Sequence, residues 1–307
     1  MNRSIFVMMV GLPGSGKSTE AQKLAFEYDA NIHSSDDIRE ELSGDINNQD
    51  INDLVFKTLH SRIKEDLLNG KNCIYDATNI SYKRRMAFLC ELNKIPCVKV
   101  CVFMATPYEE CLKNNSKRDR VVPEGVIKRM YMNFDVPFWY EGWDKILTVY
   151  QSYRGYYGDP ISWCENMKQY DQKNPHHTLS LGYHCELAYN AIQQKYGTTS
   201  NRDVAMRVAT MLHDEGKEFC QTFVNCKNEV TDIAHYYHHE HVGSYDSLFY
   251  DMTCDPLDVA AIIRWHMQPY FWEKDNNEKS HDKYRRLWGL DLYADIMALH
   301  LSDKNAH

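Results

Sequence analysis

The sequence predicts two domains of different fold class: an α/β domain with a parallel sheet wrapped by helices over residues 1–152, and an all-α domain over residues 173–307. The chain has 307 residues, which is enough for two domains. Strand and helix patterns alternate in the first part, whereas only helical patterns follow a Tyr- and Gly-rich linker at residues 153–172. Histidine follows the same division, because only His33 and His60 of the fourteen histidines precede the linker.

The first part alternates short apolar runs with helical patterns, and this rhythm predicts a parallel sheet covered by helices. The loops at the carboxyl ends of its strands would form the site. We expect strands in SIFVMMV, NIHSS, NCIYDAT, CVKVCVFMAT and KILTVYQ, and helices from about Ser18, through DLVFKTLHSRIKEDLL and around RRMAFLCELN.

A glycine-rich loop lies between the first predicted strand and the first predicted helix. The stretch GLPGSGKST fits the pattern G-x-x-x-x-G-K-S, in which backbone N–H groups point at phosphate oxygens. Lys17 would supply charge to the β- and γ-phosphates, and Ser18 can ligate Mg²⁺. The loop therefore predicts binding of ATP or another nucleoside triphosphate with Mg²⁺. The residues expected to bind it are Gly11, Gly14, Ser15, Gly16, Lys17, Ser18 and Thr19.

Two strand ends favour a kinase over other ATPases. Asp36 and Asp37 follow the second predicted strand, where one of them could take the proton of an acceptor hydroxyl. Arg39 could hold an acceptor phosphate, whereas a helix N-cap is the alternative role for one of the aspartates. Asp76 ends the third predicted strand and could support Mg²⁺ or an arginine, or simply form a turn.

A basic segment at residues 111–130 is divided into two helices by Pro123. This arrangement predicts a lid that places an arginine on the transferring phosphoryl group. A solvated run of charges is the alternative explanation. The basic residues of the segment are Lys113, Lys117, Arg118, Arg120, Lys128 and Arg129.

The set GLPGSGKST, SSDDIR, DATN and NSKRDRVVPEGVIKRMY resembles the 5′-hydroxyl polynucleotide kinase domain of phage polynucleotide kinase-phosphatases, over about the first 150 residues. The resemblance implies that Asp36 is the general base and that Arg39 contacts an acceptor 3′-phosphate. It also implies that Arg118 is catalytic.

The same resemblance places the nucleotide clamp on Asp76, Arg118 and Arg120. One residue departs from the family pattern: Asn114 stands where the phage enzyme has a lid arginine. Lys113 or Arg120 would then have to compensate.

The second part places histidine and aspartate on helices that are otherwise apolar. ATMLHDEGK, IIRWHMQ and ALHLSDKNA each end an apolar run with such groups, and burying them without a partner would cost several kcal/mol. A shared metal removes that cost, and imidazole with carboxylate suits Mn, Fe, Ni, Co or Zn. A satisfied core histidine is the alternative for any one of them alone. We expect helices at about 178–196, 202–214, 235–251, 256–268 and 287–304.

The order H…HD…H…H…D, with HHTLSLGYH before the doublet and LHLSD after it, resembles the HD superfamily of metal-dependent phosphohydrolases over roughly residues 174–305. The resemblance implies one or two divalent metals, with phosphate contacts from His177 and from Lys217, the second counted as catalytic. The middle ligand is one of His235, His238, His239 and His241, of which His239 fits the family pattern best. The implied metal ligands are His184, His213, Asp214, His239, His266 and Asp303.

Both resemblances together imply an enzyme that heals RNA or DNA ends. It would phosphorylate a 5′-hydroxyl and remove a 3′-phosphate or a 2′,3′-cyclic phosphate, and an RNA ligase would use the product. The phage family pairs its kinase with a D-x-D-x-T phosphatase motif that this sequence lacks, so the HD part would take that role. A nucleoside or metabolite kinase joined to a nucleotidase is the alternative.

Charge and composition bear on the partners. The net charge of −8 lies in residues 158–307, which excludes a broad nonspecific nucleic-acid surface there and leaves such contact to a local basic patch. Ten cysteines without a CxxC pair predict reduced thiols and a cytoplasmic protein. No apolar run approaches the roughly 18 residues of a membrane span, so we expect no membrane partner. The sequence does not decide whether the chain forms a homo-oligomer.

Overall fold

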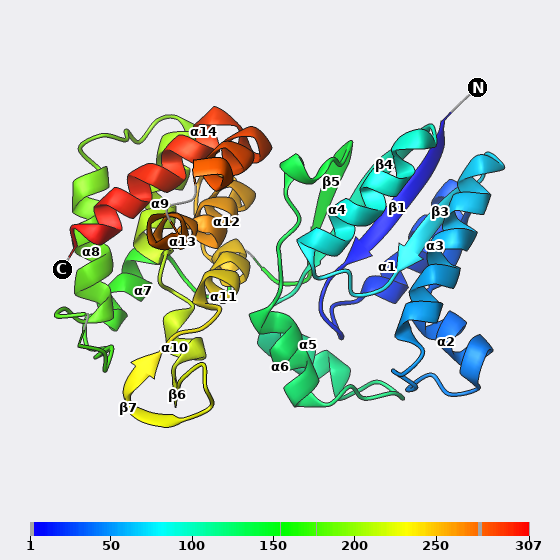
Figure 1. Cartoon of the computed structure of the whole chain (residues 1–307), viewed down its shortest axis with the longest axis horizontal. Helices are drawn as coiled ribbons and strands as arrows, with labels where there is room; N and C mark the ends of the chain where they lie inside the picture. The colour runs from blue at the N-terminus through cyan, green and yellow to red at the C-terminus, as the bar shows by residue number, and fades with distance from the viewer. Residues whose placement is uncertain (1–2, 154, 176, 276–277, 307) are drawn as a thin grey trace. The chain divides into compact units, whose positions relative to one another are not determined.

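The computed structural model describes residues 3–153, 155–175, 177–275 and 278–306. The chain forms two compact units, shown in Figure 1. Unit 1 comprises Met1–Met130 and Pro137–Gln151, and unit 2 comprises Tyr131–Val136 and Ser152–His307.

Unit 1 is built on a five-stranded parallel sheet in the order β2-β3-β1-β4-β5 (Figure 1). The prediction of a parallel sheet wrapped by helices is confirmed. β1 is buried at nearly every position because helices cover both faces of the sheet, as a continuous apolar strand requires. The strands are β1 (Ser4–Val10), β2 (Ala30–Ser34), β3 (Asn72–Asp76), β4 (Cys97–Ala105) and β5 (Lys145–Tyr150).

The two faces of this sheet are covered by different helices. Val7 and Met9 of β1 join the core cluster that contains Ala21 of α1. On the other face Phe6 meets Phe88 of α4, with ring centroids 5.6 Å apart. The helical segments of unit 1 are α1 (Lys17–Tyr28), α2 (Ser35–Ser43), α3 (Asn52–Leu68), α4 (Tyr82–Glu91), η1 (Leu92–Lys94), α5 (Tyr108–Asn115), α6 (Glu124–Met132) and η2 (Trp139–Glu141), the end of α6 falling in unit 2.

A buried ion pair fixes the loop that follows β3. The Arg85 side chain is 1% exposed and donates to both carboxylate oxygens of Glu141, at 2.7 and 2.6 Å. Arg85 also donates to the carbonyl of Asn79, at 2.9 Å. We expect Glu141→Gln to lower the free energy of unfolding of unit 1 by about 3–5 kcal/mol, because it leaves the guanidinium buried without a counter-charge. Urea denaturation followed by a probe in unit 1 measures this change.

A surface pair in the same unit provides the matched control. Arg62 donates to both oxygens of Glu41, at 2.8 and 2.6 Å, but the two side chains are 39% and 55% exposed. Solvent screens such pairs, so Glu41→Gln should change stability far less. Equal losses from the two substitutions would contradict the importance of burial at Glu141.

Unit 2 is mainly helical but contains an antiparallel hairpin, so the prediction of an all-α second domain is wrong in this respect. The hairpin is formed by β6 (Thr222–Val224) and β7 (Val230–His235), whereas a helix was expected to begin at about residue 235. The helical segments of unit 2 are α7 (Pro160–Met167), α8 (Leu181–Ile192), α9 (Asn201–Leu212), α10 (Lys217–Cys220), α11 (His239–Asp246), η3 (Ser247–Phe249), α12 (Pro256–Trp265), α13 (Gln268–Asp275) and α14 (Glu278–Lys304).

Two segments near the expected domain boundary belong to unit 2. The expected linker at residues 153–172 contains α7, which starts at the N-cap Asp159 and buries Trp163. Residues 131–136 also pack in unit 2, where Tyr131 donates to Asp246. Among the described residues, no helix has the length and apolar character needed to cross a membrane.

Candidate functional site

The glycine-rich loop of unit 1 wraps around the Lys17 ammonium group, which donates to the Leu12 carbonyl at 2.7 Å. Burial lowers the pKa of Lys17 to about 8, although Asp76 opposes this shift. Gly14 has a φ of 83°, and a Cβ there would lie 2.2 Å from the carbonyl oxygen of Cys111. Only glycine therefore fits at this position, and the loop backbone stays free to face a phosphate.

The strand end carries Asp76 beside this loop. Burial raises the pKa of Asp76, against the opposing effects of Lys17 and of a hydrogen bond with Ser18. The Asn79 side chain donates to the Met9 carbonyl at 2.8 Å and so holds the loop after β3 against β1. A hydroxyl and a carboxylate next to a phosphate-binding loop are hard oxygen ligands, so Ser18 and Asp76 fit Mg²⁺.

Asp36 lies between two arginines. Its oxygens accept from Arg39 and from Arg120, each at 2.7 Å. Arg39 is only 4% exposed. The N-cap of α2 is Ser34, whose hydroxyl accepts from the backbone N–H groups of both aspartates, so the alternative role of an aspartate as the N-cap is wrong. The carboxylate of Asp36 is therefore held in a fixed direction, whereas Asp37 is exposed.

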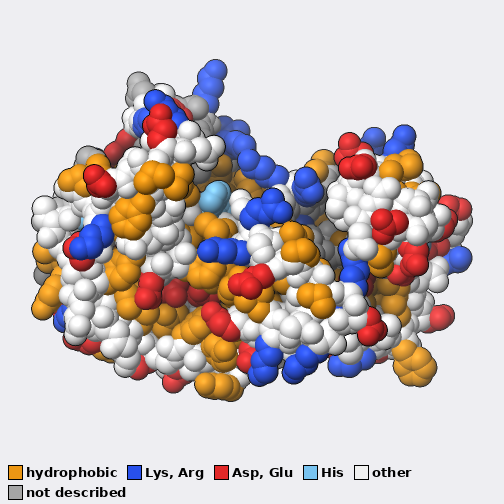
Figure 2. Space-filling model, turned by 90° about the horizontal axis from the view of Figure 1, so that it is seen from below, with side chains coloured by type: hydrophobic (Ala, Val, Ile, Leu, Met, Phe, Trp, Pro, Cys, Tyr) orange, Lys and Arg blue, Asp and Glu red, His pale blue; other side chains and the backbone are white. Residues whose placement is uncertain are grey.

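The expected lid forms a loop between α5 and α6. The Asn115 side chain joins the two ends of this loop. It donates to the Val122 carbonyl at 2.8 Å and accepts from the Val122 N–H at 3.0 Å. Asn114 donates to the Gly14 carbonyl at 3.2 Å, and Arg118 is exposed. Lysine and arginine side chains gather near the middle of the face in Figure 2. The exposed basic residues of the segment are Lys113, Lys117, Arg118, Lys128 and Arg129.

In unit 2 the six expected metal ligands meet in two groups that share Asp214. In the first group the Nε2 atoms of His184 and His213 are 3.2 Å apart. Asp303 Oδ1 lies 3.0 Å from the first of these atoms and 3.5 Å from the second. Asp214 Oδ2 lies 3.4 Å from each. All four residues are buried.

The second group lies beside the other carboxylate oxygen of Asp214, Oδ1. The Nε2 atoms of His239 and His266 are 3.2 Å apart, and Asp214 Oδ1 lies 3.3 and 3.8 Å from them. Metal–ligand bonds of about 2.1 Å place neighbouring ligand atoms roughly 3.0–3.4 Å apart, which is close to most of these spacings. Asp214 therefore presents one carboxylate oxygen to each group.

The hydrogen bonds of the four imidazoles leave each ring able to act as a metal ligand. Each Nδ1 lies 2.7–2.8 Å from a backbone carbonyl, which can only accept, so each Nδ1 carries the proton. A neutral ring then offers only a lone pair at Nε2, and two such lone pairs would face each other at 3.2 Å in both groups. A metal between them would remove this repulsion, and the carbonyl contacts are those that metal-binding histidines use.

Burial and neighbouring charges shift the pKa values of the imidazoles in opposite directions. Burial lowers the pKa of His184, but Asp214 and Asp303 outweigh it and raise that pKa to about 10. The opposite holds for His266, whose pKa falls to about 4 because of burial and the neighbouring histidines. Cys185 also lies beside the first group, but burial raises the pKa of its thiol well above the ordinary value, so the protonated thiol is a poor ligand.

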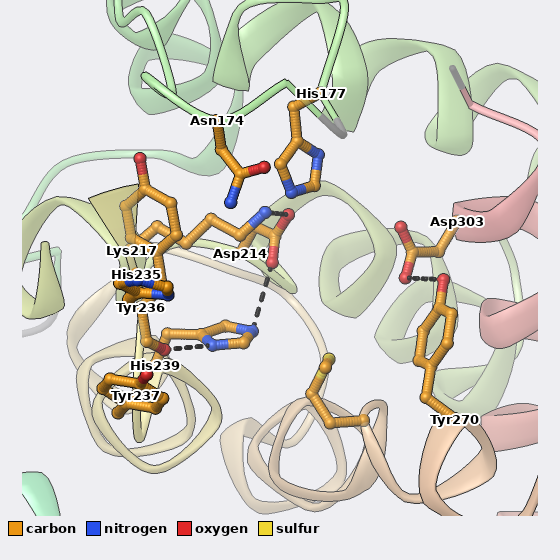
Figure 3. Close-up of a pocket in the computed structure, with 11 residues that line it drawn as sticks. Asn174, His177, Asp214, Lys217, His235, Tyr236, Tyr237, His239, Tyr270 and Asp303 are labelled. Carbon is orange, nitrogen blue, oxygen red and sulfur yellow. Dashed lines mark hydrogen bonds and ion pairs between the residues drawn. The ribbon is translucent and has the colours of Figure 1, made fainter. Parts of the chain in front are cut away.

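A pocket of about 380 Å³ opens beside these groups (Figure 3). The ammonium of Lys217 lies 2.7 Å from Asp214 Oδ2 and donates to Gln172 at 2.9 Å. Across the pocket Tyr270 donates to Asp303 Oδ2 at 2.9 Å. The lining residues are Asn174, His177, Asp214, Lys217, His235, Tyr236, Tyr237, His239, Met267, Tyr270 and Asp303.

The four candidate middle histidines have separate environments. His239 lies in the second group, and His235 lines the pocket. His241 donates from Nδ1 to the Phe134 carbonyl at 3.2 Å, and His238 is exposed. Sequence reasoning missed the three tyrosines, Met267 and Asn174 of the pocket, because no motif marks them and only the fold brings them to the metal ligands.

The close approach of α11 explains why the HDEGK stretch has glycine at position 216. A Cβ at this position would lie 2.2 Å from the carbonyl oxygen of His239 and 2.8 Å from the N–H nitrogen of Gly243. Because both atoms are backbone, Gly216→Ala must push α11 away and carry His239 out of its group. We expect this variant to weaken metal binding by roughly 10–100-fold, measured by titration with Mn²⁺.

Gly197→Ala is the control for this substitution, because a Cβ there meets only the Asp203 side chain, at 3.3 Å. That variant should bind metal as the unchanged protein does. Unaltered metal affinity in Gly216→Ala would show that His239 does not depend on this close approach.

Several known proteins are similar to up to half of this chain. Residues 6–137 match the model of a family described as an AAA domain. The chain is 28% identical over 144 residues to L-seryl-tRNA(Sec) kinase of Methanococcus maripaludis, covering 46% of this chain and 56% of that protein. It is 23% identical over 154 residues to protein kti12 of Schizosaccharomyces pombe, covering 46% and 55%. The chain thus spans about half the length of the curated relatives it matches.

Two solved structures are similar to part of this chain. A chain of the Pnkp1/Rnl/Hen1 RNA repair complex is 22% identical, with a TM-score of 0.39, covering 43% of this chain and 44% of that one. A gluconokinase from Sinorhizobium meliloti 1021 is 14% identical, with a TM-score of 0.35, covering 50% and 86%. The family match and the curated relatives support a P-loop phosphotransferase of the kinase type for the first part of the chain.

Proposed function

We propose that the chain is a bifunctional enzyme that heals nucleic-acid ends. Unit 1 transfers the γ-phosphate of ATP to a 5′-hydroxyl of RNA or DNA, and unit 2 removes a 3′-phosphate or opens and removes a 2′,3′-cyclic phosphate. The observation that carries the proposal is the presence in one chain of a phosphate-binding loop facing a fixed aspartate and of a buried group of four histidines and two aspartates.

In unit 1 the backbone of the glycine-rich loop and Lys17 hold the phosphates, and Ser18 with Asp76 holds Mg²⁺. Asp36 accepts the proton of the acceptor hydroxyl, and the arginines that now contact it bind phosphate groups of the acceptor and the nucleotide. Arg118 lies on the exposed lid loop, from which it can approach the transferring phosphoryl group. The likeness to a kinase named for a tRNA-borne seryl group supports a hydroxyl acceptor attached to nucleic acid.

In unit 2 the six grouped residues hold one or two divalent transition metals. Bound there, a metal would act as a Lewis acid on the phosphate ester. Lys217 and His177 line the same pocket and would neutralise and orient the phosphate oxygens. Tyr270 keeps Asp303 in position through its hydroxyl.

One RNA tests both activities. It carries a 5′-hydroxyl and a 2′,3′-cyclic phosphate and is incubated with γ-labelled ATP, Mg²⁺ and a panel of transition metals, and both ends are read by mass. We expect a labelled 5′ end and a free 3′-hydroxyl. An unlabelled 5′ end would overturn the kinase assignment, and an unchanged 3′ end would overturn the assignment of unit 2.

A small-molecule kinase joined to a nucleotidase is the second candidate, because a pocket of about 380 Å³ could also enclose a mononucleotide. Competition separates the two candidates. An end-healing enzyme should be inhibited far better by 5′-hydroxyl oligonucleotides than by nucleosides, and the reverse order would favour the small-molecule enzyme.

A further inference from the structure

The pocket of unit 2 has two ends of different chemistry. The metal groups, Lys217 and His177 form one wall, and three consecutive aromatic side chains at the end of β7 form another (Figure 3). A phosphate ester that reaches the first wall must place the rest of its molecule against the remaining walls. These three side chains belong to His235, Tyr236 and Tyr237.

The three rings do not lie together. The rings of His235 and Tyr237 are in contact where the chain turns after β7, and the Tyr236 ring points away from them (Figure 3). The rings of His235 and Tyr237 are nearly parallel, with an interplanar angle of 10° and centroids 5.5 Å apart. Figure 3 shows both rings edge-on, one above the other.

Hydrogen bonds fix this segment relative to the metal ligands. The Tyr236 hydroxyl donates to the Gln172 carbonyl. The backbone carbonyl of Tyr236 accepts from Nδ1 of His239 at 2.8 Å. His235 Nε2 lies 3.4 Å from the Thr231 hydroxyl within β7. The ring pair is therefore held only a few residues from a metal ligand.

We propose that His235 and Tyr237 form a platform on which the terminal nucleobase of a 3′-phosphorylated strand stacks. This inference rests on the proposed function and names how unit 2 recognises its substrate. Tyr237 is 39% exposed, and both residues line the pocket, from which a base can approach them. Stacking on aromatic side chains accepts any base, because every base has a π-face.

Charge favours this mode of recognition over attraction to the phosphate backbone. The whole excess of negative charge lies in residues 158–307, which weakens long-range attraction to a polyanion. A short-range, uncharged contact with the last nucleotide can select a strand end under these conditions. Recognition by stacking is therefore consistent with the parallel rings and with the negative charge of unit 2.

The test uses the quenching of 2-aminopurine fluorescence, which reports stacking without turnover. An oligonucleotide with 2-aminopurine as the 3′-terminal, 3′-phosphorylated nucleotide is titrated with metal-free protein, so that the phosphate is not removed during the measurement. We expect quenching with the unchanged protein, and Tyr237→Ala should raise the Kd roughly 5- to 100-fold or abolish the quenching. Tyr237→Trp should retain it.

Two controls separate stacking from other losses. Phe223→Ala removes an exposed aromatic side chain of the same hairpin that does not line the pocket and should leave the quenching unchanged. Moving 2-aminopurine several nucleotides upstream should remove the effect of Tyr237→Ala. Equal quenching by Tyr237→Ala and the unchanged protein would overturn the platform.

Hydrolysis then distinguishes the platform from the phosphatase assignment. With the unchanged protein, a strand whose 3′-phosphorylated terminal sugar lacks its base should show a higher KM than the intact strand. With Tyr237→Ala, the two strands should show the same KM. Hydrolysis of both strands with equal KM by the unchanged protein overturns the platform alone. Terminal quenching without any hydrolysis overturns the phosphatase assignment and keeps the platform.

Discussion

Asp36→Asn is expected to slow phosphate transfer to a 5′-hydroxyl oligonucleotide by about 10²–10⁴-fold, the usual contribution of a positioned general base. The amide cannot take the proton of the acceptor, although it keeps the size of the carboxylate. Binding of ATP should persist, because Lys17 and the glycine-rich loop do not depend on this side chain. Single-turnover transfer from γ-labelled ATP measures the loss, and equilibrium binding of an ATP analogue measures what remains.

Asp37→Asn is the matched control, since it makes the same chemical change one residue away. Asp37 is exposed, whereas the oxygens of Asp36 are fixed by Arg39 and Arg120. The control should transfer phosphate at nearly the original rate. If the two variants lose activity equally, the loss reflects the charge of the α2 N-terminus and not a base at Asp36.

Unit 1 was predictable because its signals are local. The glycine-rich loop needs a strand before it and a helix after it, and β1 and α1 provide both within residues 4–28. The apolar β1 indicated a sheet covered on both faces. The contact of Arg120 with Asp36 could not be predicted, because it joins residues 84 positions apart through the fold of the lid.

The five helices expected in unit 2 correspond to α8, α9, α11, α12 and α14, whereas α7, α10, α13 and the pocket were not predicted. The hairpin was missed because β6 has only three residues and its turn, NCKNE, lacks glycine and proline. The spacing of His213, Asp214 and Asp303 marked candidate ligands, and the structure brings them together. The facing Nε2 pairs and the ring pair beside them depend on side-chain directions that no motif encodes. The roles of all these residues stay predictions.

Asp214→Asn is expected to reduce release of the 3′ phosphate by at least about 10³-fold, because it removes the carboxylate that both metal groups share. An amide keeps one oxygen ligand and has no charge to balance a cation or the nearby Lys217. The metal content after dialysis, measured by mass spectrometry, should fall in parallel. Transfer to the 5′ end should stay unchanged, because unit 1 contributes none of these ligands.

Asp295→Asn separates loss of the metal site from loss of a buried charge. Asp295 is 4% exposed, like Asp214 at 3%, but it pairs with Arg202 and accepts from Tyr196, away from the metal groups. This variant should lose stability yet keep its metal and its 3′ activity. Retention of metal and 3′ activity by Asp214→Asn would show that the buried histidines and aspartates are structural. A matching loss of 5′ transfer would show that the two reactions are not carried by separate sites.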